Sequence, residues 1–233
     1  MNKLAVITGG TKGIGRAAAE KFAQHGFDIA TCARSQNDVD NFAEEMKSFG
    51  VKTYPFAFDL SKKEEAQKFV GEVLKFGRPT DVLINNAGTF QSGDLLTEEE
   101  GSLERMITTN LYSAYYVARG IAPAMIKQKA GHIINICSVA SLKAYPGGGS
   151  YAVSKFAMLG FTKQLREDLK NTGVRVTGVM PGATQTSSWD GVALPEGRLM
   201  KPEDIASAIY AAYSLSSRSV VEEILIRPQL GDV

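Results

Sequence analysis

The sequence predicts an α/β protein whose parallel sheet is covered by helices on both faces. Apolar segments with the length of strands alternate with helical patterns seven times along the 233 residues. Near-continuous apolar strands of this kind are typical of parallel sheets that are buried on both sides. The chain carries no internal repeat, low-complexity tract or linker, so we expect a single domain over residues 1–233.

Composition and charge narrow the possible functions. Apolar residues make up 44% of the chain and charged residues 22%, which suits a globular core. The net charge of +1 indicates no binding to nucleic acid or to an anionic membrane. Apolar runs are shorter than the roughly 18 residues of a membrane span, and the start lacks the pattern of a secretory leader. The two cysteines, Cys32 and Cys137, predict no disulfide framework and no metal site, so we expect a cytoplasmic protein.

The first expected element is an apolar strand over residues 4–7, followed by a glycine-rich turn and a helix that stops at Gly26. Between a strand and a helix, the spacing Gly-x-x-x-Gly-x-Gly indicates nucleotide binding. Glycines let the backbone approach a pyrophosphate at the positive end of the helix. The alternative is a tight turn without a ligand. The residues of this turn assigned to a cofactor are Gly9, Thr11, Lys12, Gly13, Ile14 and Gly15.

The second strand, over residues 27–33, ends in Arg34 and Ser35. A site for NAD usually places an acidic residue here, where it holds the ribose 2′-hydroxyl. Arg34, together with Lys12 from the glycine turn, would instead meet a 2′-phosphate. The pattern therefore favours NADP(H) over NAD(H), with Arg34 and Ser35 in the site; the alternative is a pair of solvated basic side chains.

A helical pattern over residues 35–50 leads to a third strand over 51–58, which Asp59 and Leu60 close. Asp59 could accept a hydrogen bond from an adenine amino group, or it could begin the next turn. We assign both closing residues to the cofactor site. Residues 61–64 carry a capping-box signature, which predicts the start of the next helix.

The fourth strand, over residues 81–84, ends in Asn-Asn-Ala-Gly. Small and amide side chains at the C-terminal end of a strand suit close contact with a ligand. We therefore assign Asn86, Ala87 and Gly88 to the cofactor site.

A loop over residues 89–102 precedes a long helix over 103–129, with Asn110 near its middle. Asparagine inside a helix costs propensity, so Asn110 lies either on an exposed face or in a site where its amide is hydrogen-bonded. This helix and the one that contains Tyr151 carry more apolar side chains than one sheet contact readily buries. We therefore expect a homodimer or homotetramer.

An apolar strand over residues 133–137 runs into Ser138, and a glycine-rich loop then leads to a helix with Ser150 as its expected N-cap. Tyr151 and Lys155 are four residues apart and share one helix face. The ammonium would stabilise the phenolate, so we expect a more acidic tyrosine that exchanges a proton with a substrate oxygen. Ser138 could hydrogen-bond the same oxygen. The alternative is an ordinary solvated Tyr–Lys pair.

The sixth strand covers residues 174–179 and ends before a Pro-Gly pair. The segment 183–200 lacks periodicity, has few apolar residues and contains Trp189, the only tryptophan. Low contact density of this kind suits a substrate lid, in which Trp189 is the apolar anchor; the alternative is a fixed tryptophan. A last helix begins at Pro202, and a closing strand covers residues 220–226.

The motifs as a set resemble the short-chain dehydrogenase/reductase family over nearly the whole chain. Residues 8–15 resemble its cofactor loop, 85–88 its Asn-Asn-Ala-Gly motif, and 181–186 the segment that holds the nicotinamide carboxamide. The resemblance implies a doubly wound, Rossmann-type sheet of about seven parallel strands. It also implies hydride transfer between a nicotinamide and the carbonyl or alcohol of a small molecule.

The resemblance also implies residue roles. Asn110, Ser138, Tyr151 and Lys155 match the family's catalytic tetrad in order and spacing. Tyr151 would be the general acid in reduction, and Lys155 would acidify it and bind the ribose hydroxyls. Ser138 would polarise the carbonyl, and Asn110 would hold a water in a proton relay. The remaining contacts assigned to the cofactor are those of Tyr151, Lys155, Pro181, Gly182, Thr184 and Thr186, and those assigned to the substrate are Tyr145 and Trp189.

The C-terminal residues 222–233 depart from the ketoacyl reductases of the family, which usually end near an acidic residue and a Gly-Gly pair. They look more like the sepiapterin-reductase-like and hydroxy-acid dehydrogenase members. The leading interpretation is an NADPH-dependent carbonyl reductase, and one alternative is a 3-oxoacyl-carrier-protein-type reductase. Epimerases and dehydratases of this type usually have longer chains, and non-catalytic nucleotide sensors commonly lose the tyrosine or lysine.

Overall fold

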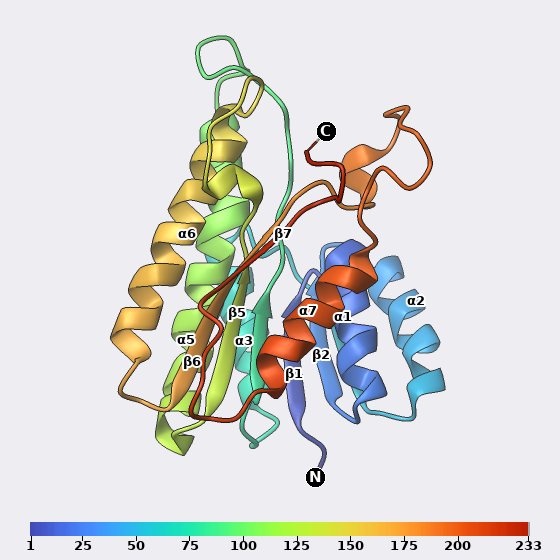
Figure 1. Cartoon of the computed structure of the whole chain (residues 1–233). Helices are drawn as coiled ribbons and strands as arrows, with labels where there is room; N and C mark the ends of the chain where they lie inside the picture. The colour runs from blue at the N-terminus through green and yellow to red at the C-terminus, as the bar shows by residue number, and fades with distance from the viewer. Residues whose placement is uncertain (233) are drawn as a thin grey trace.

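In a computed structural model, which describes residues 1–232, the chain forms one sheet of seven parallel strands in the order β3-β2-β1-β4-β5-β6-β7 (Figure 1). The predicted fold class is thereby confirmed. Pro55 lies in the edge strand β3, where its missing N–H costs no ladder bond on the open side. The strands are β1 (Leu4–Thr8), β2 (Asp28–Ala33), β3 (Thr53–Ala57), β4 (Val82–Asn85), β5 (Gly131–Ile136), β6 (Val174–Pro181) and β7 (Glu223–Ile226).

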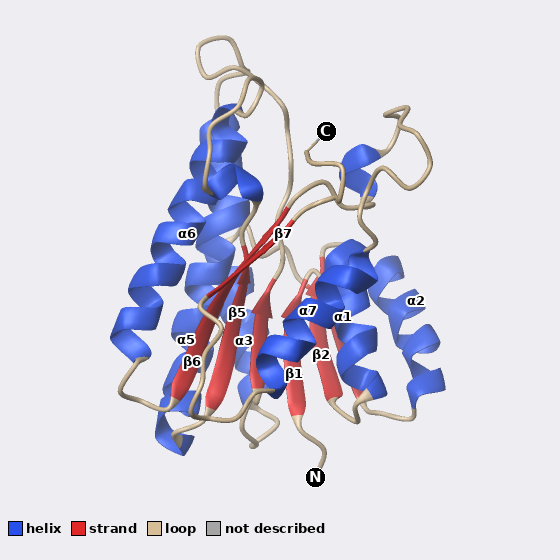
Figure 2. Ribbon diagram, viewed as in Figure 1, coloured by secondary structure: helices blue, strands red, loops and turns tan. Residues whose placement is uncertain are grey.

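Helices cover both faces of the sheet, as Figure 2 shows. α1, α2 and α7 pack on one face, and α3, α5 and α6 on the other. Strand β1 contributes side chains to the hydrophobic cores on both faces. Ala5 and Ile7 pack in the core under α1, α2 and α7, whereas Leu4 and Val6 pack in the core under α3, α5 and α6. The helices are α1 (Gly13–Gln24), α2 (Gln36–Met46), α3 (Lys63–Leu74), α4 (Ser102–Ile107), α5 (Ser113–Gln128), α6 (Gly149–Leu169) and α7 (Pro202–Ser214).

The strand order reverses between β1 and β4, so the chain leaves these neighbouring strands toward opposite sides of the sheet. Ligands of doubly wound sheets bind in the crevice at this switch point. The register aligns Ile7 with Ile84 and Asn85 with Asn135, so the carboxyl ends of β1, β4 and β5 meet at one edge. The glycine turn, the Asn-Asn-Ala-Gly segment and Ser138 therefore share that edge.

The predicted helix over 103–129 is not one regular helix. A π-helical turn, Thr108–Tyr112, separates α4 from α5, and it contains Asn110. Asn110 is 1% exposed, which excludes the alternative of an exposed helix face. π-Turns are often found at functional sites.

Two predicted helix caps do not form. Ser61 lies before the start of α3 and donates its hydroxyl to Asp59 Oδ1 at 2.7 Å. Ser150 is the second residue of α6 rather than its N-cap, because the helix already begins at Gly149. The first turn of α6 therefore needs a partner from elsewhere in the chain.

Within residues 1–232, no helix combines the length and apolarity that crossing a bilayer requires.

Candidate active site

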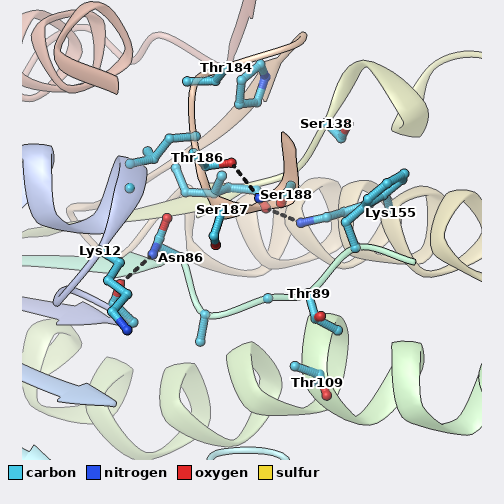
Figure 3. Close-up of a pocket in the computed structure, with 18 of the residues that line it drawn as sticks. Lys12, Asn86, Thr89, Thr109, Ser138, Lys155, Thr184, Thr186, Ser187 and Ser188 are labelled. Atoms are coloured by element: carbon cyan, nitrogen blue, oxygen red, sulfur yellow. Dashed lines mark hydrogen bonds between the residues drawn. The ribbon is translucent and has the colours of Figure 1, made fainter. Parts of the chain in front are cut away.

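A cavity of about 770 Å³ lies at the carboxyl edge of the sheet. This volume is within the range of roughly 300–1,000 Å³ that is typical of small-molecule and cofactor sites. Figure 3 shows side chains around it, among them Lys12, Asn86, Thr89, Ser138, Lys155, Thr184, Thr186, Ser187 and Ser188. The residues predicted to bind cofactor or substrate that do line it are Gly9, Thr11, Lys12, Gly13, Ile14, Arg34, Ser35, Asp59, Leu60, Asn86, Ala87, Gly88, Tyr145, Tyr151, Lys155, Pro181, Gly182, Thr184, Thr186 and Trp189.

The glycine turn is braced from the neighbouring strand β4. The Asn86 side chain donates to the carbonyls of Thr8 and Gly9, each at 3.0 Å. The Thr8 hydroxyl in turn accepts the N–H groups of Asn86 and Ala87, also at 3.0 Å. These bonds hold the turn open at the N-terminus of α1, where backbone N–H groups and the helix dipole favour a phosphate.

Gly15 does not line the cavity, contrary to its assignment to the cofactor. A Cβ on Gly15 would lie 2.3 Å from both the Asn86 side-chain nitrogen and the Gly9 carbonyl oxygen. Gly15 is therefore needed for close packing of α1 against the brace. Gly9 and Gly13, with φ of +65° and +55°, do line the cavity, and this side-chain-free cradle fits a dinucleotide pyrophosphate.

The two predicted cations at the end of β2 differ in their surroundings. Lys12 Nζ is 2.7 Å from Asp38 Oδ2 in α2, so its charge is already paired. Arg34 is exposed and has no carboxylate partner among residues 1–232. Ser35 caps α2 by accepting the Asp38 N–H at 3.2 Å.

Asp59 has a local structural role. Its Oδ1 accepts the Ser61 N–H at 3.1 Å and the Ser61 hydroxyl at 2.7 Å, which closes the turn after β3. The prediction that Asp59 begins the next turn is therefore correct. Asp59 also lines the cavity, so contact with an adenine stays a prediction.

Ser138, Tyr151 and Lys155 line the part of the cavity beside β5, away from Arg34 and Asp59 at the ends of β2 and β3. Lys155 is 6% exposed, donates to the Ile136 carbonyl at 3.0 Å, and its Nζ lies 5.8 Å from the centre of the Tyr151 ring. Ser138 begins the turn after β5, and its hydroxyl accepts the Ala140 N–H at 3.1 Å. The Tyr–Lys pair is thus partly enclosed in a cavity, unlike a solvated surface pair.

The expected acidification of Tyr151 is not found. Burial raises the pKa of the Tyr151 phenol above its ordinary value, and the interaction with the Ser138 hydroxyl lowers it only in part. Burial also lowers the pKa of the Lys155 ammonium. The Lys155 ammonium donates to the Ile136 carbonyl, and desolvation is the largest influence on the pKa of both groups. The phenol is consequently neutral at pH 7, which is the form that can donate a proton.

Residues 3–195 match the family model for short chain dehydrogenases. The chain belongs to this family. The sepiapterin reductase of Chlorobaculum tepidum is 33% identical, with 100% of this chain and 99% of that protein aligned.

Solved structures agree with this assignment. A metagenomic short-chain oxidoreductase in complex with NADP is 32% identical over 97% of both chains, with a TM-score of 0.85. The alcohol dehydrogenase of the archaeon Thermococcus sibiricus, complexed with 5-hydroxy-NADP, is 28% identical over 98% of this chain and 97% of that chain, with a TM-score of 0.91. This chain is therefore an oxidoreductase of the short-chain dehydrogenase type.

In this short-chain dehydrogenase, Asn110 lies behind the cavity wall rather than in it. Its amide oxygen accepts the Thr89 N–H at 2.7 Å, and its amide nitrogen donates to the Thr89 carbonyl at 3.0 Å and to Ser154 Oγ at 2.9 Å. Both amide N–H groups are thereby used by protein atoms. Asn110 ties the segment after β4 to α6, and its predicted role in holding a water stays a prediction.

Some residues that line the cavity of the dehydrogenase were not predicted from sequence. Phe90 packs edge-on against Tyr151, with ring centres 4.9 Å apart, and a lone aromatic in a polar loop was its only signal. Arg227 and Asp232 line the cavity from the C-terminal tail, because β7 lies beside β6 and Gly182 N–H bonds the Ile226 carbonyl at 2.8 Å. No local pattern marks this tail.

Proposed function

We propose that this dehydrogenase is an NADPH-dependent reductase of a small-molecule carbonyl compound. One observation supports this most directly: a single cavity is lined by Ser138, Tyr151 and Lys155 beside β5 and, beyond β1 and β4, by Arg34, which has no carboxylate partner among residues 1–232. The first group suits proton transfer to a carbonyl oxygen, and Arg34 suits a 2′-phosphate. A metagenomic relative that was solved with NADP supports the same cofactor.

Each residue has a role in the proposed reduction. A reduced nicotinamide held beside Gly88 and Thr186 would supply the hydride. Ser138 would donate a hydrogen bond to the carbonyl oxygen, and the neutral Tyr151 phenol would donate the proton to that oxygen. The Lys155 ammonium would then stabilise the phenolate that remains, an interaction worth more in a buried site than in water.

The proposed reaction is tested by following NADPH oxidation with a panel of ketones, diketones, sepiapterin and a 3-oxoacyl thioester. Turnover of small ketones or diketones is the expected result. Preferential turnover of the thioester would instead favour the acyl-carrier alternative. Tight NADPH binding without turnover of any compound would support a nucleotide sensor and contradict the proposal.

Arg34→Ala should weaken NADPH binding about tenfold or more and leave NADH binding little changed. Charge-assisted hydrogen bonds to the 2′-phosphate contribute roughly 1.5–3 kcal/mol to binding. The exposed Arg34 guanidinium has no carboxylate partner among residues 1–232 that would compete with this phosphate. Lys12→Ala is the matched comparison, with a smaller expected effect because Asp38 already pairs with Lys12. Titration of nicotinamide fluorescence measures both affinities. Equal affinity of the unmodified protein for NADPH and NADH would contradict this prediction.

We propose that residues 183–200 form a substrate lid. Hydrogen bonds between Gln185 N–H and the Met200 carbonyl (2.9 Å) and between Met200 N–H and the Ala183 carbonyl (3.0 Å) close its base. Ser187, Ser188 and Trp189 line the cavity. Closure would exclude water from the reacting centre.

Trp189 emission should therefore change when a substrate analogue is added to the NADPH complex. NADPH alone can quench by energy transfer, so the added change is the measurement. An unchanged emission together with unaltered protease cleavage within residues 183–200 would leave no basis for a lid.

We propose a homodimer or homotetramer. On the two helices with many apolar side chains, Ile121, Met125, Met158 and Leu159 are buried in the core. Others remain on the surface of the same two helices, with Val153 and Phe156 of α6 38% and 45% exposed and Tyr112 beside α5 43% exposed.

Light scattering at micromolar concentration should accordingly give a mass of two or four chains. Phe156→Glu should shift that mass toward the monomer, since a charge there would be buried in the contact. A monomeric mass for the unmodified protein would contradict the proposal.

We also propose a cytoplasmic location, because both cysteines are free and buried, as in proteins of reducing compartments. Recovery of the protein from the membrane fraction of lysed cells would contradict it.

A further inference from the structure

The first turn of α6 carries Tyr151 but has no side-chain cap of its own. Its N-cap residue is Gly148, and Gly149 follows with a φ of +43°. The first N–H groups of a helix have no acceptors within the helix. A glycine start is also the least ordered start available, because glycine has the most backbone freedom. The position of Tyr151 therefore depends on what holds this turn from outside.

Glu98 supplies the missing acceptor from the loop before α4. Its Oε2 accepts the Ser150 N–H at 3.3 Å, and its Oε1 accepts the Ser150 hydroxyl. Ser150 is 1% exposed, so this contact is shielded from water. A carboxylate at a helix N-terminus also interacts favourably with the helix dipole. Glu98 thus acts as an N-cap of α6 although it is 52 residues away in the chain.

The backbone is shaped to admit this carboxylate. A Cβ on Gly149 would lie 2.9 Å from Glu98 Oε2 and 2.5 Å from the Gly93 carbonyl oxygen. Gly93 N–H donates to the Gly147 carbonyl at 3.0 Å, and Gly93 also pairs with Gly148 in a parallel bridge. Figure 1 shows these two loops side by side at the top of the molecule, green and yellow. Only glycine permits such a close approach at Gly149.

The same loop contacts the tyrosine ring directly. Phe90 lies edge-on to Tyr151 at 4.9 Å with an interplanar angle of 88°. The loop over residues 89–101 therefore holds the helix turn through Glu98 and the ring through Phe90.

We propose that Glu98 is a positioning residue for Tyr151, which acts through Ser150 to hold the first turn of α6. The proposal rests on the proposed function, in which Tyr151 is the proton donor. A displacement of about 1 Å from the reacting geometry can lower a rate by roughly 10²-fold.

The test begins with Glu98→Ala, which should lower kcat about tenfold or more while the Kd for NADPH changes less than about twofold. The glycine cradle and Arg34 belong to other elements, so cofactor affinity should respond much less than the catalytic step. Glu98→Gln keeps an acceptor oxygen and should restore kcat to within about threefold of the unmodified enzyme. Ser150→Ala should lower kcat as well. The Glu98→Ala/Ser150→Ala double variant should have a kcat no lower than that of the less active single variant, because both substitutions act through one contact.

Glu100→Ala is the matched control, since Glu100 is exposed and lies two residues further along the same loop. It should leave kcat unchanged. A kcat for Glu98→Ala within twofold of the unmodified enzyme, additive losses in the double variant, or a parallel loss of NADPH affinity would each overturn the proposal.

Hydrogen exchange gives a readout that needs no substrate. In Glu98→Ala, the amides of residues 149–152 should exchange roughly two- to thirty-fold faster, the range expected for a lost cap, while the C-terminal half of α6 is unchanged. Unchanged exchange at 149–152 would overturn the positioning role even if no substrate is found. An unmodified enzyme without turnover, combined with the faster exchange, would instead contradict the proposed reduction alone. If Glu98→Ala does not fold, kcat and the exchange of amides 149–152 are compared between Ser150→Ala and Glu98→Gln instead.

Discussion

Tyr151→Phe is expected to abolish turnover, with kcat lowered by about 10²–10⁴ and NADPH affinity nearly intact. The substitution removes only the hydroxyl that would donate the proton, and the ring would keep its contact with Phe90. Neither Ser138 nor Lys155 can replace it, because the serine hydroxyl is weakly acidic and the ammonium donates to the Ile136 carbonyl. Single-turnover measurement of NADPH oxidation, with a parallel binding titration, separates the two effects.

Tyr54→Phe is a suitable control because Tyr54 lies in the edge strand β3, outside the cavity. It should leave both kcat and NADPH affinity unchanged. A kcat for Tyr151→Phe within about tenfold of the unmodified enzyme would rule out Tyr151 as the general acid.

The second large effect concerns stability in acid and originates at His132 in β5. His132 is 0% exposed, and its Nε2 lies 2.7 Å from Thr177 Oγ1. Thr177 gives its own proton to the Val221 carbonyl, so Nε2 of His132 carries the proton and Nδ1 is bare. Nδ1 is buried without a hydrogen-bond partner among the described residues. Protonation would therefore place an unpaired cation in the core.

Burial, helped by the nearby Arg175 cation, lowers the pKa of His132 from 6.5 to about 3. Between these two values the unfolded chain binds a proton that the folded chain does not, so the free energy of unfolding should fall as the pH falls from 6.5 toward 3. The loss is about 1.4 kcal/mol for each pH unit, or several kcal/mol in all. Total stabilities are typically about 5–15 kcal/mol, so this single group is expected to dominate acid unfolding.

Urea unfolding at a series of pH values measures this dependence. His132→Gln should flatten the slope between pH 6.5 and 3, whereas His25→Gln should not, because His25 is exposed. Equal slopes for the His132 variant and the unmodified protein would show that other groups cause the acid sensitivity.

Much of the fold could be read from local patterns. The strands were recognisable because most of their residues are apolar, as Leu4 to Ile7 illustrate, and such runs are needed when both sheet faces are covered. The glycine turn and the pair formed by Tyr151 and Lys155 were recognisable because their spacing reflects backbone geometry within one or two turns. The placement of the ligand site at the carboxyl edge then followed from a general rule for parallel sheets.

Contacts between segments far apart in the chain could not be read in this way. The sequence assigned Gly15 to the cofactor, but the side chain of Asn86 occupies the space beside it. It paired Lys12 with a phosphate, but Asp38 of α2 already binds that ammonium. The sequence also predicted Ser150 as the N-cap of the helix that contains Tyr151, whereas the Ser150 hydroxyl donates to Glu98.

The protonation state of Tyr151 and the cavity residues contributed by the C-terminal tail could not be predicted from local patterns either. Whether Tyr151 is acidified depends on how deeply it is buried and on where the Lys155 ammonium is directed, and both are set by packing around β5. Arg227 reaches the cavity only because β7 pairs with β6. Residue type and spacing thus determined which groups meet at the carboxyl edge, since backbone geometry is local. Tertiary packing determined which of them are free to act, since desolvation and hydrogen-bond competition depend on every neighbour in space.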